Sequence, residues 1–279
     1  MKIIYSEKCL EYHDVHIESP ERVEKARDIL KGEGYAFINP SLASLEDILL
    51  AHEEIYVERI KSGDFYDPDT PAYENIYEYA RLSAGGAILA AKERSFSLMR
   101  PPGHHAGRDG KALRASSLGF CFFNNIAIAV KKLRLPTLIL DIDGHHGNGT
   151  QEIFQREPRV TFVSLHRYPH YPGTGSESEG NCLNFPLSSQ TGDELYLKTL
   201  NNALAQVDLK NIEVVGISAG FDAHQGDLAS LDLTTKCYLE IGRRISKLGK
   251  PVFGILEGGY IGANIGADIH GLIRGLEEK

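Results

Sequence analysis

The apolar positions of this chain form short continuous runs that rarely alternate with polar positions. Continuous runs of β-branched and other apolar residues are typical of parallel strands that are covered on both faces. The pattern predicts strands over these segments: Lys2–Tyr5, Phe96–Met99, Thr137–Leu140, Val160–Leu165, Glu213–Ser218 and Val252–Leu256.

Amphipathic segments of helical length lie between these runs. Ser19 and Pro20 are typical of the cap and first turn of a helix that reaches Leu30, and Gly32 and Gly34 then end it. Further helices are predicted over Glu74–Lys92, Asn124–Leu133, Asp193–Val207, Thr234–Leu248 and Ile265–Leu276. Strands that alternate with helices predict an α/β fold with a mainly parallel central sheet and helices on both faces.

The composition fits one large domain with a sizeable core. The chain has 279 residues, of which 42% are hydrophobic, and we expect one domain over residues 1–279, although length alone leaves two domains open. The segment Ser62–Tyr73, rich in Asp, Gly and Pro, predicts a surface loop. The net charge of −8 gives no electrostatic footprint for nucleic acid, so we expect no direct nucleic-acid binding.

Three features of the sequence bear on its compartment. No apolar run is long enough to span a bilayer, so no membrane association is expected. The segment Met1–Tyr5 lacks the basic and apolar regions of a signal peptide. The four cysteines are widely spaced and form no CxxC pair, which indicates neither a zinc ribbon nor a redox pair. We therefore expect a cytoplasmic protein.

Candidate chemistry collects where the predicted strands end. Five strands run directly into a polar or glycine-rich string: RPPGHH at 100–105, DIDGHHGNGT at 141–150, RYPHYPGTG at 167–175, AGFDAH at 219–224 and EGGY at 257–260. Ligands of open α/β sheets bind beyond the carboxyl ends of the strands. Parallel strands therefore predict that the five strings meet at one edge and build a single composite site.

The first half of the DIDGHH string predicts a metal site. Residues two apart in an extended chain face the same side, so Asp143 and His145 can point at one ion, while Asp141 lies deeper and suits a supporting role. Asp222, at another strand end, completes a set of three ligands, although a lone Asp at a strand end is more often a cap or turn residue. Three ligands with an open position are typical of catalytic zinc, and the oxygen-rich set also suits Fe²⁺.

The tandem histidines His104 and His105 predict proton transfer. One imidazole at a strand end can take a proton from an activated water and return it to a leaving amine. Such an imidazole needs an orienting partner on its other ring nitrogen, and Asp141 and Asn148 are the available groups. A single histidine would more often be a structural hydrogen-bonding group, whereas the pair favours catalysis.

Tyr260 follows two glycines that allow the backbone to turn sharply beside a ligand. A phenol O–H is a suitable donor to the oxyanion that develops when a carbonyl is attacked. Tyrosine is common in this chain, so a catalytic role for Tyr260 is supported only by the other polar strings predicted to lie around it.

These motifs together resemble the histone deacetylase superfamily, which includes acetylpolyamine amidohydrolases and acetoin-utilisation proteins of the arginase–deacetylase fold. The resemblance rests on RPPGHHA, GFCFFNN, DIDGHHGNGTQEIF, SLHRYPHYPGTG, SAGFDAHQGD and EGGY in this order and spacing. HIESPERVEKA at 16–26 and FYDPDT at 65–70 fit as well, so the resemblance covers nearly the whole chain. It implies a zinc-dependent amidohydrolase that removes an acyl group from an amine.

The resemblance also implies a role for each matched residue. The zinc ligands are Asp143, His145 and Asp222. His105 is the main general base and acid, and His104 is its electrostatic partner, held by Asp141. Asn148 orients His105, and Tyr260 stabilises the tetrahedral oxyanion.

The resemblance further implies a substrate channel and a potassium ion. Phe120 and Tyr171 flank a narrow channel for the acylated side chain, and Gly119 allows close approach. The matched potassium site uses side-chain or backbone groups of Asp141, Asp143, His145, Ser164 and Leu165.

One departure from the family affects the channel rim. After Asp227 the sequence reads LASLDLT, where many relatives have Pro–Leu–Gly–Gly. The chain is short for the family, and without the insertion that narrows the entrance of the polyamine enzymes we expect an open mouth. The substrate is then acetyl-lysine or another small N-acyl amine, with an acetylpolyamine as the alternative. The oligomeric state stays open.

Two other functions are less favoured. A binuclear-metal ureohydrolase of the arginase type would need more Asp ligands and has no tandem His–His before the metal strand. An inactive acyl-lysine binding protein should have lost Tyr260, one of the paired histidines or a ligand, and all are present.

Overall fold

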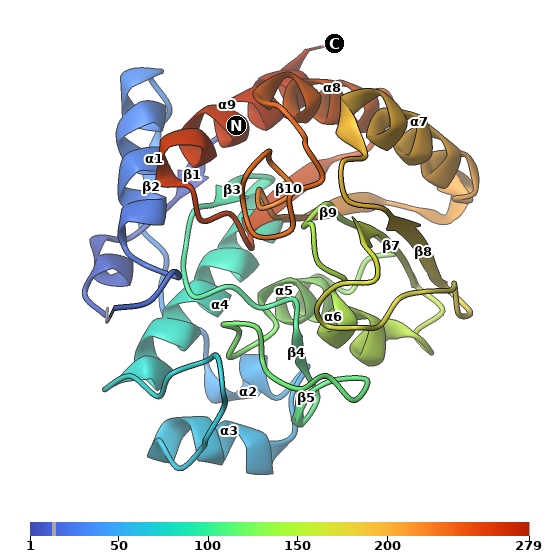
Figure 1. Ribbon diagram of the computed structural model, residues 1–279. Helices are drawn as coiled ribbons and strands as arrows, with labels where there is room; N and C mark the ends of the chain where they lie inside the picture. The colour runs from blue at the N-terminus through green and yellow to red at the C-terminus, as the bar shows by residue number, and fades with distance from the viewer. Residues whose placement is uncertain (13–14, 279) are drawn as a thin grey trace.

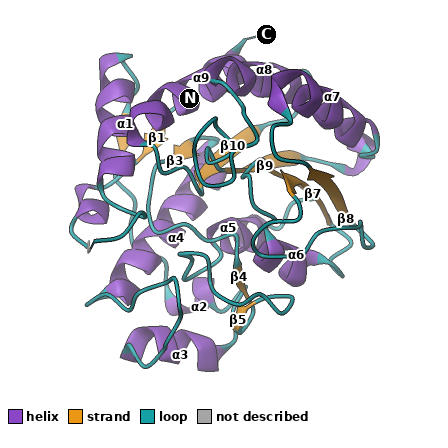
Figure 2. Cartoon of the chain, in the orientation of Figure 1, coloured by secondary structure: helices purple, strands orange, loops and turns teal. Residues whose placement is uncertain are grey.

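One parallel sheet forms the centre of the protein. The structure, a computed structural model, describes residues 1–12 and 15–278, and within them eight strands join in the order β2-β1-β3-β10-β9-β6-β7-β8 (Figures 1 and 2). These strands are β1 Ile3–Ile4, β2 Phe37–Ile38, β3 Phe96–Ser97, β6 Thr137–Asp141, β7 Val160–Arg167, β8 Cys182–Leu187, β9 Val214–Ala219 and β10 Val252–Leu256. Every neighbouring pair in the sheet is parallel, so the carboxyl ends of the strands share one edge.

Helices cover both faces of the sheet. Helices α1, α7, α8 and α9 lie on one face, and α4, α5 and α6 lie on the other (Figure 1). The helices are α1 Glu21–Gly32, α2 Leu45–Ile48, α3 Glu54–Ser62, α4 Ile76–Glu93, α5 Asn125–Leu133, α6 Asn148–Phe154, α7 Gly192–Ala205, α8 Thr235–Ser246 and α9 Gly262–Glu277. Two 3₁₀ turns, Glu7–Leu10 and Leu209–Asn211, and a small antiparallel ribbon, β4 Ala106–Gly107 with β5 Gly110–Lys111, complete the described elements.

Consecutive residues of the central strands pack into opposite cores. In β6, Leu138 and Leu140 join the core under α1, α8 and α9, whereas Ile139 joins the core under α4 and α5. Side chains of a strand alternate between faces, so a strand that is buried on both faces must be apolar at every position. This is why the apolar runs are continuous, and the predicted α/β class with a mainly parallel sheet is confirmed.

The structure corrects several local predictions. The prediction that Ser19 caps helix α1 is wrong, because Pro20 occupies the cap position, with helical backbone angles. Ser19 contributes its backbone carbonyl, which accepts a hydrogen bond from the Arg22 N–H at 3.3 Å. The strand Cys182–Leu187 was not predicted, because it contains Pro186 and proline is unfavourable within a strand. Pro cannot donate to a neighbouring strand, but β8 is an edge strand, where this loss is tolerated.

None of the helices within the described residues combines the length and apolar character that a bilayer span requires.

A buried ion cluster joins the N-terminal segment to the strand-end loops. The Glu18 carboxylate accepts bonds from Arg100 Nε at 2.8 Å, Arg100 Nη2 at 2.7 Å and Arg22 Nη1 at 2.7 Å. The Arg22 guanidinium also donates to the backbone carbonyls of Glu257 and Gly259. Burial alone would raise the pKa of Glu18, but the two guanidinium groups outweigh it and lower that pKa. The cluster thus fixes the position of the 257–259 backbone.

Glu18→Gln is expected to lower the free energy of unfolding by about 3–5 kcal/mol, because it leaves two buried guanidinium groups without a counter-charge. Since folding lowers the pKa of Glu18, its contribution to stability is full above the unfolded pKa of about 4.3 and is lost as the pH falls through the lower folded value. Denaturant unfolding from pH 7 downward measures both effects. Glu24→Gln, at an exposed ion pair of α1, is the control and should cost less than about 1 kcal/mol. Equal losses in the two variants would contradict this account.

Candidate active site

The five polar strings meet at one edge of the sheet, as the sequence predicts. They follow strands that are direct neighbours, in the order β3-β10-β9-β6-β7. The register places Asp141 of β6 beside Ser164 of β7 and Ser218 of β9, so the strand ends are level with one another. Loops that leave these ends therefore converge on the same space.

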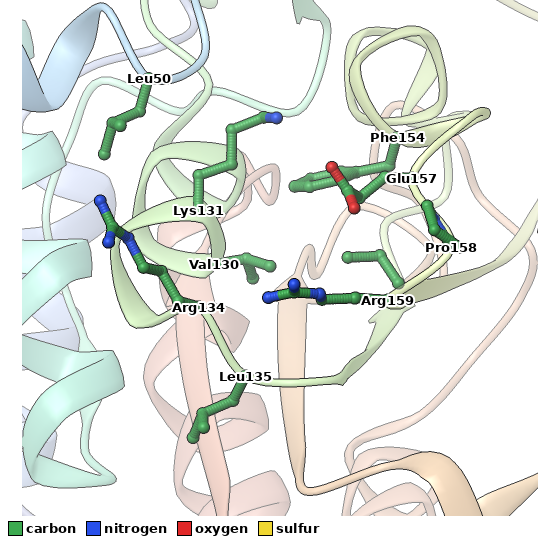
Figure 3. Close-up of a pocket in the computed structure, with 10 residues that line it drawn as sticks. Leu50, Val130, Lys131, Arg134, Leu135, Phe154, Glu157, Pro158 and Arg159 are labelled. Carbon is green, nitrogen blue, oxygen red and sulfur yellow. The ribbon is translucent and has the colours of Figure 1, made fainter.

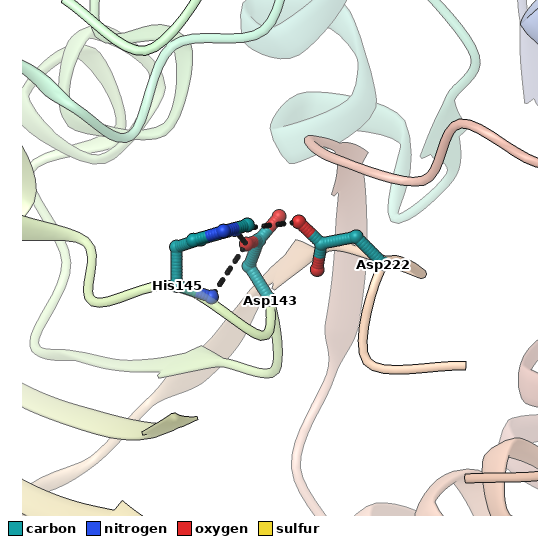
Figure 4. Close-up of side chains that lie close together, drawn as sticks. All are labelled: Asp143, His145 and Asp222. Atoms are coloured by element: carbon teal, nitrogen blue, oxygen red, sulfur yellow. Dashed lines mark hydrogen bonds and ion pairs between the residues drawn. The ribbon is translucent and has the colours of Figure 1, made fainter. Parts of the chain in front are cut away.

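Asp143, His145 and Asp222 form a buried cluster at the centre of this edge (Figure 4). Their ligand atoms all lie within 4.8 Å of one another. The His145 Nδ1 atom is 2.7 Å from Asp222 Oδ2 and 3.3 Å from Asp143 Oδ1. Backbone N–H groups orient the carboxylates, since His145 N donates to Asp143 Oδ1 at 2.9 Å and Gly144 N donates to Asp222 Oδ1 at 2.7 Å.

The electrostatics of this cluster fit a cation. Burial alone would lower the pKa of His145, but Asp222 and Asp143 outweigh it and raise that pKa to about 10. Asp141 and Glu257 add two more buried carboxyl groups, whose pKa values burial raises. Buried carboxylates are stable only when they are paired or bind a metal. Two carboxylates and one imidazole therefore suit a divalent ion.

Glycine leaves the space that such an ion requires. A Cβ atom at Gly258 would lie 2.6 Å from both Asp143 Oδ2 and Asp222 Oδ2. The Gly258 N–H donates to Asp143 Oδ2 at 2.8 Å, so the backbone itself approaches the carboxylate. Any side chain at this position would displace the candidate ligands.

His104 is held beneath the cluster by carboxylates. Its Nδ1 atom is 2.9 Å from Asp141 Oδ2, and its Nε2 atom is 3.8 Å from Asp143 Oδ1. Burial alone would lower the pKa of His104, but Asp141 and Asp143 raise it to about 10. The backbone N–H groups of Gly103 and His104 donate to the Glu257 carboxylate at 2.7 and 3.1 Å, which fixes the loop.

His105 is held as a neutral imidazole in one tautomer. Its Nδ1 atom is 2.7 Å from Asn148 Oδ1, and Asn148 Nδ2 donates to the Ala112 carbonyl at 2.9 Å. The amide orientation is thus set by Ala112, and an acceptor oxygen faces His105 Nδ1, which must carry the proton. Burial and the positive charge of His104 lower the pKa of His105. The lone pair of Nε2 is left to accept a proton.

Tyr260 is positioned through its backbone and its ring. The Asp227 Oδ2 atom accepts bonds from the N–H groups of Tyr260 at 2.8 Å and Ile261 at 2.9 Å. The Arg22 guanidinium lies 4.6 Å from the centroid of the Tyr260 ring, and the Phe120 ring meets it edge-on at 5.5 Å. Burial raises the pKa of Tyr260, so its hydroxyl stays protonated and remains a donor.

A cavity of about 390 Å³ opens above these groups. Its lining comprises Asp69, His105, Gly119, Phe120, His145, His170, Tyr171, Leu228 and Tyr260. The residues predicted to form a channel, Gly119, Phe120 and Tyr171, are thus brought together. A Cβ atom at Gly119 would lie 2.7 Å from the Tyr171 hydroxyl and would overlap the His105 ring.

The predicted surface loop Ser62–Tyr73 supports the wall of this cavity. Asp69 Oδ1 accepts the Gly119 N–H at 3.1 Å, and Thr70 Oγ1 accepts the Phe120 N–H at 2.9 Å. Phe120 has a φ of +67°, which is costly for a residue with a side chain. These two hydrogen bonds stabilise the strained backbone of Gly119 and Phe120 in the cavity wall. The loop therefore has a role in the site as well as connecting two helices.

Sequence reasoning assigned no role to several residues of the site. His170 lines the cavity with its ring 5.1 Å from that of His145, and Leu228 lies at the mouth. Asp227 and Glu257 hold the Tyr260 and His104 backbones. The sequence could have pointed to three of these four residues, because His170, Asp227 and Glu257 lie inside the motifs RYPHYPGTG, AGFDAHQGD and EGGY.

The residues matched to a potassium site also lie close together. Asp141 and Ser164 are paired across β6 and β7, and Asp141 Oδ1 accepts the Asp143 N–H at 3.1 Å. The Ser164 hydroxyl is 2.9 Å from His166 Nδ1. Leu165 follows in the same buried strand.

Comparisons with known proteins agree with this geometry. The histone deacetylase domain profile matches residues 16–276. A probable deacetylase of Archaeoglobus fulgidus is 38% identical over 92% of this chain and 80% of that protein. Acetylpolyamine amidohydrolase 1 of Pseudomonas aeruginosa is 35% identical over 76% of this chain and 66% of that protein. Among solved structures, the HD domain of HDA15 has a TM-score of 0.89 and 31% identity, covering 99% of this chain and 87% of that one.

The fold and the comparisons thus define a hydrolase of α/β architecture that acts on amide bonds. The chain belongs to the histone deacetylase family, as the sequence motifs indicated.

Proposed function

We propose that the protein is a zinc-dependent deacetylase that hydrolyses N-acyl amines such as acetyl-lysine. One observation carries this proposal: His105, His145 and Tyr260 all line a single cavity, with Asp143 and Asp222 beside His145. A candidate metal ligand, a neutral base and an oxyanion donor therefore face one substrate-sized space. Acyl transfer to water needs these three functions.

Asp143, His145 and Asp222 would hold the ion. When bound, a divalent ion polarises a carbonyl and makes water acidic enough to ionise near neutral pH. Zinc is favoured because three protein ligands with an open position are typical of catalytic zinc, and the two carboxylates also suit Fe²⁺. We further propose K⁺ at the group formed by Asp141, Asp143, His145, Ser164 and Leu165.

His105 would move the protons. Its Nε2 atom accepts a proton from the attacking water and then returns it to the leaving amine. Asn148 holds the required tautomer, and the charge on His104, whose ring centroid is 4.0 Å from that of His105, favours the neutral form before attack. The Tyr260 hydroxyl would donate a hydrogen bond to the oxyanion as the carbonyl becomes tetrahedral.

Phe120 and Tyr171 would flank the acyl chain and exclude bulk water. Aromatic walls suit a flat amide on a thin aliphatic stem.

The decisive experiment is a turnover screen of zinc-loaded protein on acetyl-lysine peptides, acetylated polyamines and longer acyl-lysines. Absence of turnover on every N-acyl amine would overturn the proposed function.

The cavity mouth favours acetyl-lysine or a broad set of N-acyl amines over acetylpolyamines. Among the described residues, Asp69 is the one carboxylate in the cavity lining, and its oxygens already accept bonds from Gly119, Ser117 and Thr70. Leu228 adds an exposed apolar side chain at the mouth. A polyamine with several positive charges therefore finds no unengaged carboxylate here.

We expect kcat/KM for acetylpolyamines to exceed that for acetyl-lysine peptides by less than about 100-fold, which corresponds to nearly 3 kcal/mol of discrimination. Steady-state kinetics on matched substrates measure this ratio. A larger preference for the polyamine would establish the alternative, acetylpolyamine amidohydrolase, which the similarity to the P. aeruginosa enzyme supports.

A further inference from the structure

A second cavity, of about 580 Å³, lies near the amino-terminal ends of strands β6 and β7. Figure 3 shows the residues that line it. It opens between the end of α5 and the segment that joins α6 to β7, beside the first residues of β6 and β7. The active-site strings follow the other ends of these strands. The second cavity is therefore separated from the proposed active site by the length of β6, and the proposed function leaves it without a role.

Three cations face this cavity. Lys131 and Arg134 extend from the end of α5 on one side, and Arg159 extends from the opposite side (Figure 3). None of the three makes an ion pair with a carboxylate of residues 1–12 or 15–278. The neighbouring Lys132, which does not line the cavity, pairs with Asp47 at 2.7 Å. At this end of α5, the two cations that face the cavity are therefore unpaired, whereas Lys132, which lies outside it, is paired.

Few negatively charged side chains face this cavity. Glu157 is the one carboxylate in the described lining, against three cations. Lys131 is partly buried, with its Nζ atom 5.4 Å from the centroid of the Phe154 ring. Burial and the nearby Arg108 guanidinium lower the pKa of Lys131. Attraction to an anion is stronger in such a partly dehydrated place than in bulk water.

Apolar side chains form the rest of the lining. Leu50, Leu135 and Pro158 are at least partly exposed and face the cavity, and the buried side chains of Val130, Phe154 and Val160 lie beneath its surface. Ligand sites combine a mostly apolar surface with a few placed charges, and they occupy roughly 300–1,000 Å³. The cavity lies inside this range.

We propose that this cavity binds an organic anion that carries at least two negative charges and a flat ring, such as a nucleoside diphosphate. Arg134 and Arg159 contact the phosphates from opposite sides, since a planar guanidinium bonds phosphate oxygens in pairs. The ring lies against the partly exposed apolar side chains that line the cavity, Leu50 and Leu135.

The competing account is that the cations only complement two helix ends. Helices α5 and α6 both end beside the cavity, and cations near a helix C-terminus are stabilising. That account requires no ligand, and it predicts lower stability when the cations are removed. Binding measurements separate the two accounts.

The test is calorimetric titration of the zinc-loaded protein with ADP, pyrophosphate and adenosine, without added magnesium. A hydroxamate inhibitor is present throughout, so that the phosphates cannot reach the metal of the proposed active site. We expect ADP to bind with a Kd below about 1 mM, at least about tenfold tighter than pyrophosphate or adenosine, and more weakly as salt rises. Equal binding of ADP and pyrophosphate, or no saturable binding of ADP, would overturn the proposal.

Variants locate the binding. Arg134 has a φ of +59°, so Arg134→Asn is chosen because Asn tolerates this conformation. Combined with Arg159→Gln, it should raise the Kd for ADP at least about tenfold with little change in thermal stability. Lys132→Gln, on the same helix end but outside the cavity, is the matched control and should change the Kd by less than about twofold. An unchanged Kd in the double variant would contradict the assigned site.

Discussion

Tyr260→Phe is expected to lower kcat by about 10²–10³-fold, the scale measured for the loss of one oxyanion donor, or about 2.7–4 kcal/mol. KM should change little, because the bond forms as the carbonyl becomes tetrahedral. The structure supports this prediction through position: Asp227 and Arg22 hold the residue beside the cavity, and the raised pKa keeps the hydroxyl protonated.

The matched control is Tyr238→Phe. Tyr238 is fully buried away from the cavity lining, and its hydroxyl has no hydrogen-bond partner among the described residues, so its removal should leave kcat within about twofold. His105→Ala should reduce kcat at least as much as Tyr260→Phe while metal content stays unchanged. A Tyr260→Phe enzyme with the kcat of the unmodified protein would remove Tyr260 from the mechanism.

Removal of metal is expected to abolish activity, and Zn²⁺, Co²⁺ or Fe²⁺ should restore it. Asp143, His145 and Asp222 form the one group of three candidate ligands found within the described residues, so no alternative cluster there can take over. Hydroxamates should inhibit, since they chelate a metal with an open side. Chelation followed by metal titration, with elemental analysis at each step, measures the dependence.

Asp222→Asn should lose bound metal, because it removes one of two carboxylates. Asp268→Asn is the control, since Asp268 also bonds a histidine, His224 at 2.8 Å, but lies outside the ligand group. It should retain one ion per chain. Full activity in verified metal-free protein would contradict the metal assignment, whereas two metal ions per chain would favour the arginase-type alternative.

Much of the site could be predicted from the sequence because parallel strands end at a common edge. Asp143 and His145 are two residues apart, and the extended chain alone makes them face one point. Asp222 and Tyr260 were predictable only through the alignment of strand ends and the family motifs. The α/β class followed from continuous apolar runs, which a strand buried on both faces requires.

The sequence alone therefore determined the fold class, the candidate ligands and the common edge where they meet, since these depend on local spacing and strand direction. Only the tertiary structure decided which hydrogen-bond partners hold the site residues in position. Asp227 bonds the Tyr260 backbone from 33 positions away, and Asp69 bonds Gly119 from 50 positions away. Such partners carry no local periodic signal, because the folded chain, and not the spacing along it, brings their atoms within hydrogen-bonding distance. The charges around the second cavity follow the same rule: Lys131 and Arg159 are distant in sequence, and only the packing of α5 beside the α6–β7 segment turns them toward one space.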